Sequence, residues 1–377
     1  MVAGGLERVV ADLSLSLTSR GHSVELFWTN HSELDRKLVA RGLVTHDCRP
    51  GRFSIPGVPH RLTKALRQFR PELLHAHSGV WYPASIGSML LRKPLVFTDH
   101  GRYLPERRRI ILLQRWCAHF TNEIVTVSEA LSVYVQQVLH LDHAPQTVDN
   151  GIDLEPFRTV EPSRRRELRT EWGFTDSDVV VVASGRLVPV KNLPGLLQAL
   201  ADAGVNSLRV VLLGTGPLEA ELRARAADLG VDSRVRFLGM RQDVADCLHA
   251  SDVFAMPSDS EGLPVALLEA MAAGLPIVAS AVGAIPSVLG SPPAGILVQP
   301  RDTAALASAL VQLATDGGMR RRLGALAGKR ASLYTLARMT DRYERIYGAI
   351  VRGPSVRSRA IRTSPNRIDP AGSVDSL

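Results

Sequence analysis

The 377-residue chain is poor in cysteine, in aromatic side chains and in charge. Its three cysteines are odd in number and lie far apart, so the sequence predicts neither a disulfide framework nor a zinc motif, and it favours a reducing cytoplasm. Aromatic residues make up 5% of the chain and no nucleic-acid-binding motif occurs, so nucleic acid ranks last among the anionic partners that a net charge of +8 permits. Charged residues make up only 22% and the apolar residues fall in short blocks, which excludes wholesale disorder.

Long apolar runs are also scarce. The one uncharged stretch of membrane-spanning length, residues 270–290, is broken by Gly274, Pro276, Gly283 and Pro286. It therefore indicates a helix end, a turn, a short strand and a second turn rather than a membrane helix. Because no basic lead, apolar core and small-residue cleavage site occur together near the start, no signal peptide is predicted. The expected localisation is cytoplasmic.

Both halves of the chain repeat a strand, a glycine-rich or polar turn and a helix, as parallel βαβ units require. In the first half we expect a helix at 6–17 and strands at 23–28, 73–76, 94–98 and 123–127. In the second half we expect strands at 179–183, 209–213, 235–238, 253–256, 277–279 and 295–298. The predicted fold is α/β, with two doubly wound, Rossmann-like domains that face each other across a cleft. The predicted divisions are 1–158, 159–333, a helix at 334–350 and a disordered tail at 351–377.

The chain starts within a glycine turn, at Gly4 and Gly5, without the buried strand that normally opens a doubly wound domain. The first strand of the N-terminal domain is therefore expected to be missing. Loss of a central strand would leave neighbouring backbone groups unpaired, which is costly in a core. Our hypothesis is that the natural start lies upstream, and an in-frame upstream sequence with no apolar strand would contradict it.

The most informative segment runs from Ser258 to Ser280. Glu261 follows a predicted strand and Glu269 lies in an otherwise apolar predicted helix, whose N-terminus offers N–H groups and a positive dipole end to an anion. A single acid of this kind is more often a solvated surface residue. Glu269, however, has apolar neighbours on both sides, and a buried carboxylate needs hydrogen-bonding partners such as sugar hydroxyls.

The two glutamates, followed by the segment 270–280, closely resemble the nucleotide-sugar site of family 4 glycosyltransferases, which are retaining enzymes of the GT-B fold. Other segments agree in order: residues 185–192 resemble the family's diphosphate-binding loop, 213–219 its second glycine turn, 148–153 the end of its first domain, His100-Gly101 its histidine loop and 4–8 its opening glycine loop. The resemblance covers roughly residues 4–350.

The resemblance implies that residues 1–158 form the acceptor side, that 159–333 bind the donor, and that the helix at 334–350 crosses back to the first domain. Glu261 would contact the donor sugar, Glu269 the ribose and His100 the reacting region. Independently, Arg186 and Lys191 lie five residues apart in one loop after a strand, where they can neutralise a departing diphosphate without a metal. The implied catalytic residues are His100, Glu261, Arg186 and Lys191. The implied donor-binding residues are Gly4, Gly5, Gly185, Arg186, Lys191, Gly214, Gly216, Glu261, Gly262, Leu263, Pro264 and Glu269.

No cofactor or metal is expected besides the donor substrate. His75 and His77 form a His-Ala-His sequence without further ligands nearby, and are interpreted as cleft-lining or structural residues. The segment 102–115 carries five arginines interleaved with aliphatic residues, and we hypothesise that it contacts an anionic membrane that carries the acceptor; a solvated amphipathic helix is the alternative.

The expected function is retaining transfer of a sugar from a UDP- or GDP-sugar to a glycan or glycolipid hydroxyl in cell-surface or exopolysaccharide biosynthesis. A catalytically inactive sugar-nucleotide-binding protein, or a truncated relic, is one alternative, and a sugar-nucleotide epimerase of the same fold is a second. Neither the base, the sugar nor the acceptor is encoded in these motifs.

Overall fold

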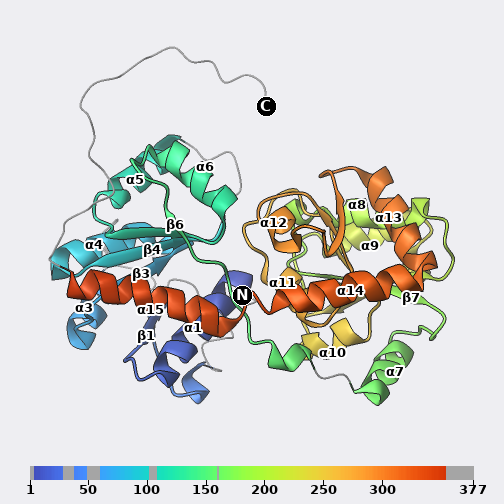
Figure 1. Ribbon diagram of the computed structural model, residues 1–377, viewed down its shortest axis with the longest axis horizontal. Coiled ribbons are helices and arrows are strands. Elements are labelled where there is room, and N and C mark those ends of the chain that lie inside the picture. The colour runs from blue at the N-terminus through green and yellow to red at the C-terminus, as the bar shows by residue number, and fades with distance from the viewer. Residues whose placement is uncertain (1–3, 29–37, 49–59, 102–107, 159–160, 354–377) are drawn as a thin grey trace, which may run out of the picture.

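The computed structural model describes residues 4–28, 38–48, 60–101, 108–158 and 161–353. In these ranges two α/β halves lie side by side, joined by crossing segments near the middle of the molecule (Figure 1). Residues 354–377 of the expected tail lie outside the described residues, as do Arg102 and Arg107 of the arginine-rich segment.

The first half divides into two parallel sheets, β1-β2 and β3-β4-β5-β6. The strands are β1 (Glu25–Trp28), β2 (Val44–Asp47), β3 (Leu74–His77), β4 (Leu95–Asp99), β5 (Glu123–Thr126) and β6 (Gln146–Thr147). The helices are α1 (Gly5–Ser19), α3 (His60–Phe69), η1 (Ser78–Val80), α4 (Trp81–Leu91), α5 (Arg108–Ala118), α6 (Glu129–Leu139) and η2 (Glu155–Phe157).

The second half holds one six-stranded parallel sheet in the order β12-β11-β10-β7-β8-β9. Its strands are β7 (Val179–Ser184), β8 (Leu208–Leu213), β9 (Val235–Gly239), β10 (Val253–Met256), β11 (Ile277–Ser280) and β12 (Gly295–Val298). The order reverses between β10 and β7, so the loops that follow these two strands open the crevice where doubly wound sheets bind ligands.

Helices cover both faces of this sheet, because its central strands are apolar throughout and bury both of their sides. The helices are α7 (Pro162–Glu171), η3 (Pro189–Lys191), α8 (Leu193–Asp202), α9 (Glu219–Asp228), η4 (Asp232–Arg234), α10 (Val244–His249), α11 (Val265–Ala272), α12 (Ile285–Leu289), α13 (Thr303–Thr315) and α14 (Gly317–Ala331).

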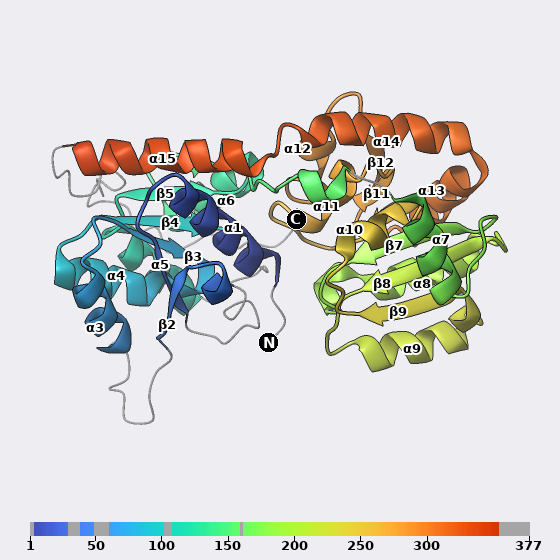
Figure 2. The same ribbon diagram turned by 90° about the horizontal axis from the view of Figure 1, so that it is seen from below.

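The final helix, α15 (Leu336–Arg352), returns to the first half and runs along α1 (Figure 2). It is tied there by Arg20 Nη1, which contacts Asp341 Oδ1 at 2.5 Å and Glu344 Oε2 at 2.6 Å. The chain crosses between the halves twice, near Ile152 and near Thr335. These two crossings pair with each other, since Ile152 forms a parallel bridge with Thr335.

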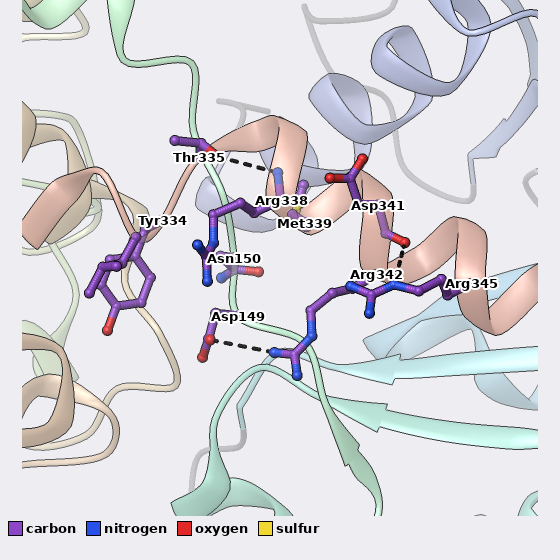
Figure 3. A pocket seen from close by; sticks show the side chains of 10 residues that line it. Asp149, Asn150, Tyr334, Thr335, Arg338, Met339, Asp341, Arg342 and Arg345 are labelled. Atoms are coloured by element: carbon purple, nitrogen blue, oxygen red, sulfur yellow. Dashed lines mark hydrogen bonds and ion pairs between the residues drawn. The ribbon is translucent and has the colours of Figure 1, made fainter.

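A cavity of about 430 Å³ opens beside these crossings, between residues 149–150 and the start of α15 (Figure 3). Asp149 and the arginines of α15 line it, with Arg342 Nη1 3.9 Å from Asp149 Oδ2. None of the predicted site residues lines this cavity, so we assign it no part in donor binding.

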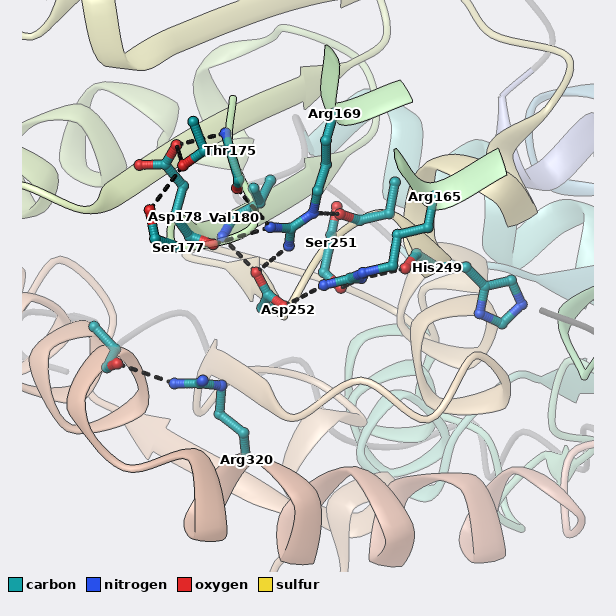
Figure 4. A network of polar contacts seen from close by, with 12 residues as sticks. Arg165, Arg169, Thr175, Ser177, Asp178, Val180, His249, Ser251, Asp252 and Arg320 are labelled. Carbon is teal, nitrogen blue, oxygen red and sulfur yellow. Dashed lines mark hydrogen bonds and ion pairs between the residues drawn. The ribbon is translucent and has the colours of Figure 1, made fainter. Parts of the chain in front are cut away.

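A buried arginine holds α7 to the second sheet (Figure 4). Arg169 is 2% exposed, and its guanidinium donates to the carbonyl oxygens of Ala250, Thr175 and Asp178 and to Asp252 Oδ2. Asp252 Oδ2 also accepts from the Val180 backbone N–H, so one carboxylate joins α7 to strand β7. Asp178, which belongs to an Asp-Ser-Asp sequence, lies in the turn before β7.

Candidate active site

The loops that follow β4 and β10 meet where the two halves touch. His100 and Gly101 come directly after β4, and Glu261 and Gly262 lie in the loop after β10. A Cβ atom on Gly262 would lie 2.2 Å from the His100 carbonyl oxygen, and one on Gly101 would lie 3.1 Å from the Gly262 Cα. Only glycines allow the two loops to approach so closely. The backbone of His100 therefore packs against the loop that carries Glu261.

The two predicted phosphate-binding cations lie in the loop after β7. Arg186 is exposed, and Lys191 ends the short helix η3. Lys191 Nζ donates to Glu261 Oε1 over 2.5 Å, and these side chains are 20% and 10% exposed. A small cavity of about 20 Å³ between the ends of β7 and β10 is lined by residues that include Gly185, Arg186 and Lys191. The structure thus brings both cations and Glu261 together at the reversal of the strand order.

Gly214 and Gly216 pack against this loop from the end of β8. A Cβ atom on Gly214 would lie 2.0 Å from the Gly185 carbonyl oxygen, and one on Gly216 would lie 2.3 Å from that of Leu187. Their absent side chains let the second glycine turn support the backbone around Arg186. The structure accounts for both glycines through packing.

Glu269 lies on α11, and the residue is 5% exposed. Burial raises the pKa of its carboxyl group, and Oε1 has no hydrogen-bond partner among the described residues. The charge nearest to this atom belongs to Arg8 of α1, whose Nη1 lies 2.7 Å away without hydrogen-bond alignment. Because a buried acceptor without a donor is costly, the carboxylate is suited to receive a ligand hydroxyl. Ser258 Oγ and Asp259 Oδ1, earlier in the same segment, are also buried, with no hydrogen-bond partner in the part of the chain that the structure describes.

The opening glycines lie against the same helix. Gly4 caps α1, and its N–H donates to Glu7 Oε2 over 2.9 Å. Gly5 sits beside Val265 at the start of α11, and the adjoining Leu263 and Pro264 are buried. The Leu263 carbonyl oxygen accepts from Asn150 Nδ2 at 2.8 Å, which links this loop to the first crossing.

A row of histidines supports His100 from within the first half. His77 Nδ1 lies 2.9 Å from His100 Nε2, so one of these nitrogens donates to the other. The His75 ring centroid lies 4.0 Å from that of His77, and its nitrogens contact Tyr347 Oη at 2.6 Å and Thr98 Oγ1 at 2.8 Å. Burial lowers the pKa of His100 to about 4 and that of His75 to about 3, and it holds the pKa of His77 well below its usual range. All three rings are therefore neutral at pH 7.

Sequence reasoning did not identify His77 as the partner of His100, nor Arg8 as the partner of Glu269. The first pairing could have been anticipated, because His77 is the last residue of β3 and His100 directly follows the adjacent parallel strand β4. The second pairing joins opposite halves of the molecule, and no local pattern separates Arg8 from other polar residues of α1. Within the described ranges, no group of three or more His, Cys, Asp and Glu side chains is arranged to hold a metal ion.

Comparison with known proteins identifies the family. The model described as Glycosyltransferase Family 4 matches residues 3–156, and the model described as Glycosyl transferases group 1 matches residues 164–330. The chain belongs to glycosyltransferase family 4. The family predicted from the sequence motifs is therefore confirmed.

This family 4 glycosyltransferase has similar relatives along nearly its whole length. The D-inositol 3-phosphate glycosyltransferase of Saccharomonospora viridis is 29% identical over 92% of this chain and 89% of its own. The N-acetyl-alpha-D-glucosaminyl L-malate synthase of Bacillus anthracis is 26% identical over 93% and 95%. Each is a transferase or synthase in name, and each aligns across both halves.

Solved structures show the same architecture. The crystal structure of Anabaena HepE in complex with UDP and glucose superimposes with a TM-score of 0.82, at 22% identity, over 92% of this chain and 96% of that one. The family 4 glycosyltransferase described here thus has the GT-B fold, as the sequence predicted. None of its helices in the described ranges combines the length and apolar character that a bilayer crossing requires.

Proposed function

We propose that this family 4 glycosyltransferase transfers a sugar from a nucleotide diphosphate donor to a hydroxyl group of a glycan or glycolipid, with retention of configuration and without a metal ion. The observation that supports the proposal is the ion pair of Lys191 with Glu261, beside Arg186 at the reversal of the second sheet, in a loop that leads into α11 and its buried Glu269. The proposed setting is cell-surface or exopolysaccharide biosynthesis in the cytoplasm.

The charges fit the parts of such a donor. Arg186 and Lys191 would neutralise the diphosphate as it leaves, which is the largest electrostatic demand of the reaction. Lys191 would exchange its Glu261 partner for phosphate oxygens, and Glu261 would then accept from hydroxyls of the sugar. Glu269 would accept from the ribose, and the neutral His100 would donate to a sugar hydroxyl.

The proposed reaction takes place on one face of the sugar. The bond between the anomeric carbon and the diphosphate oxygen breaks while the acceptor oxygen bonds to the same face. The acceptor's proton passes to the departing diphosphate, so charge and atoms balance without a further base. This front-face displacement retains the anomeric configuration, and an assay of the product anomer by NMR tests it directly.

Thermal-shift measurements with UDP-, GDP- and ADP-sugars test the donor class. A donor at about 100 times its dissociation constant would stabilise the protein by roughly 2.7 kcal/mol. UDP-glucose is the first to try, because HepE was crystallised with UDP and glucose. Transfer assays in EDTA, with glycan, lipid-linked and small polyol acceptors, then test turnover. Binding without turnover favours the inactive sugar-nucleotide-binding protein, and an isomerised donor formed without an acceptor favours the epimerase.

Helix α5 supports an acceptor held at a membrane surface. Ile110, Leu112 and Leu113 are 44%, 62% and 42% exposed, and Arg108 and Arg109 precede them at the start of the helix. Exposed aliphatic side chains beside arginines suit an anionic leaflet, where each cation contributes about 1 kcal/mol. Flotation with vesicles that contain or lack anionic lipid tests this contact, and equal flotation in both would contradict it.

A further inference from the structure

Helix α1 of the first half contributes a charge to the predicted donor site of the second half. Arg8 Nη1 lies 2.7 Å from Glu269 Oε1, and the side chains are 45% and 6% exposed. The backbone permits this contact because Gly5, one turn earlier, lies against Val265 at the start of α11. Arg8 is therefore the partly exposed member of the pair, while the carboxylate is buried.

The surroundings of Glu269 make the ionisation of its carboxyl group depend on Arg8. The charged groups that act on its carboxylate are Arg8, which lowers its pKa, and Asp12, which raises it; both belong to α1. Among the described residues α11 also contacts strand β10, which is wholly apolar, and helix α14, whose Gly328 approaches the Met271 carbonyl oxygen. Burial raises the carboxyl pKa, so Arg8 is the one group among the described residues that favours the ionised form.

We propose that Arg8 is a positioning residue for the donor: it keeps Glu269 ionised and fixed, so that the carboxylate can accept hydrogen bonds from the ribose. This inference rests on the proposed function, in which Glu269 binds the ribose. An ionised carboxylate is acceptor-only and binds hydroxyl donors more strongly than the protonated acid. Part of the donor's affinity thus comes from the opposite half of the molecule, so donor binding favours contact between the halves.

An exposed ion pair of ordinary kind would not act in this way. Between two solvated side chains the loss of one partner has little effect, because water replaces it. Here one partner is buried, and removal of the cation leaves a carboxylate that neutralises by taking up a proton. The effect of losing Arg8 should therefore appear in donor affinity and in its pH dependence.

The test compares Arg8→Gln with Arg8→Lys and with Arg20→Gln. Arg20 lies at the other end of α1 and pairs with α15, so its substitution controls for damage to the helix. In R8Q we expect the KM for the donor to rise at least tenfold, with kcat within about threefold of the parent. The acid limb of kcat/KM should move to higher pH, because a larger share of Glu269 is then protonated. R8K should restore the limb, and R20Q should match the parent.

A double substitution establishes whether Arg8 acts through Glu269. If it does, R8Q should add little to the loss already caused by Glu269→Gln, because no charge remains to be stabilised. Additive losses, or an R8Q enzyme with unchanged KM and unchanged acid limb, would overturn the inference. A parent enzyme that binds no nucleoside diphosphate in calorimetry would instead overturn the proposed function, so the two failures are distinguishable.

Discussion

At the scale of single residues, the predicted donor site neutralises its own charges. Lys191 is paired with Glu261 and Arg8 with Glu269, and three of these four side chains are mostly buried. Buried charges without partners are costly, so each pair stabilises the unliganded cleft. A donor that carries both phosphates and hydroxyls can replace both partners of the Lys191 pair at once, whereas a bare anion can satisfy only the cation.

Substitution of Lys191 by Gln should lower kcat by a factor of about 10²–10³, the usual cost of removing one preorganised group that stabilises developing charge. Glu261→Gln should lose activity to a similar degree, with the fold retained in both variants. Steady-state transfer kinetics and circular dichroism measure the two effects. Arg223→Gln, which breaks an exposed pair with Glu219 on α9, is the control. Full activity in both K191Q and E261Q would refute the site assignment.

The histidine row makes stability depend on pH. The native pKa values lie near 3 for His75 and 4 for His100, and that of His77 is also depressed, whereas an unfolded histidine titrates near 6.5. Between about pH 6.5 and 4 the unfolded chain binds more protons, so the free energy of unfolding falls as the pH falls. At pH 5 we expect a loss on the order of 1–2 kcal/mol each for His75 and His100, and a further loss in the same direction from His77.

Urea unfolding at pH 7.5, 6 and 5 measures this loss. His77→Gln should flatten the dependence, because its amide does not titrate, while His119→Asn should leave it unchanged because His119 is exposed. If the free energy of unfolding fell equally with pH in the parent and in H77Q, His77 would not contribute to the pH dependence of stability. At neutral pH, the intact row should present His100 as a neutral ring to the donor.

At the scale of elements, α7 shows how an arginine-rich helix can be part of a core. Its sequence is highly charged, yet Leu168 and Arg169 are buried and Trp172, which follows it, is 2% exposed. Arg169 donates to three carbonyl oxygens that close the turns around β7 and β10, in addition to Asp252. The guanidinium thereby joins these segments by hydrogen bonds to their carbonyl oxygens, which an apolar side chain could not form.

Arg169→Met should destabilise the protein by about 3–5 kcal/mol, since it leaves buried acceptors and the carboxylate of Asp252 without their partner. Arg158→Met removes an exposed pair with Glu155 and should change stability by less than about 1 kcal/mol. Chemical unfolding of both variants gives the comparison. Equal stabilities would mean that the network in Figure 4 contributes little to the fold.

Sequence patterns predicted the elements that are apolar on both faces and missed those that are not. Strands β7 and β8 were expected within one residue of their ends, because all of their valines and leucines are buried. Strand β2 was missed because its four residues include Thr45, His46 and Asp47, and β6 because it has only two residues. The same holds for the site. Lys191 and Glu261 were predicted because they lie in loops that follow strands. The pairing of Arg8 with Glu269 was missed because the two residues are 261 positions apart and no local sequence pattern connects them.

At the scale of the whole molecule, two kinds of contact join the halves. One kind comes from the chain crossings: Ile152 pairs with Thr335, and α15 packs along the first half, where the Thr98 and Tyr343 hydroxyl groups share a hydrogen bond. The other consists of two direct contacts between the halves: Gly101 touches Gly262, and Arg8 lies against Glu269. We infer that the second kind opens and closes about the first. Closure would bring His100 to the donor and exclude water.

Gly262→Ala should therefore separate closure from nucleotide binding. Its Cβ atom would fall 2.2 Å from the His100 carbonyl oxygen, and backbone on both sides cannot yield without moving the halves apart. We expect transfer to fall by a factor of at least 10² as His100 is displaced, a loss typical of mispositioned reacting groups. A nucleoside diphosphate should still bind through Arg186 and Lys191, which lie wholly in the second half, but more weakly, because moving the halves apart also separates Arg8 from Glu269. Small-angle scattering should report a larger radius of gyration than for Gly317→Ala, where the added methyl group meets only arginine side-chain tips. If G262A kept full transfer activity and an unchanged radius, contact between these two loops would be unnecessary for catalysis, and His100 would have to act from the open arrangement.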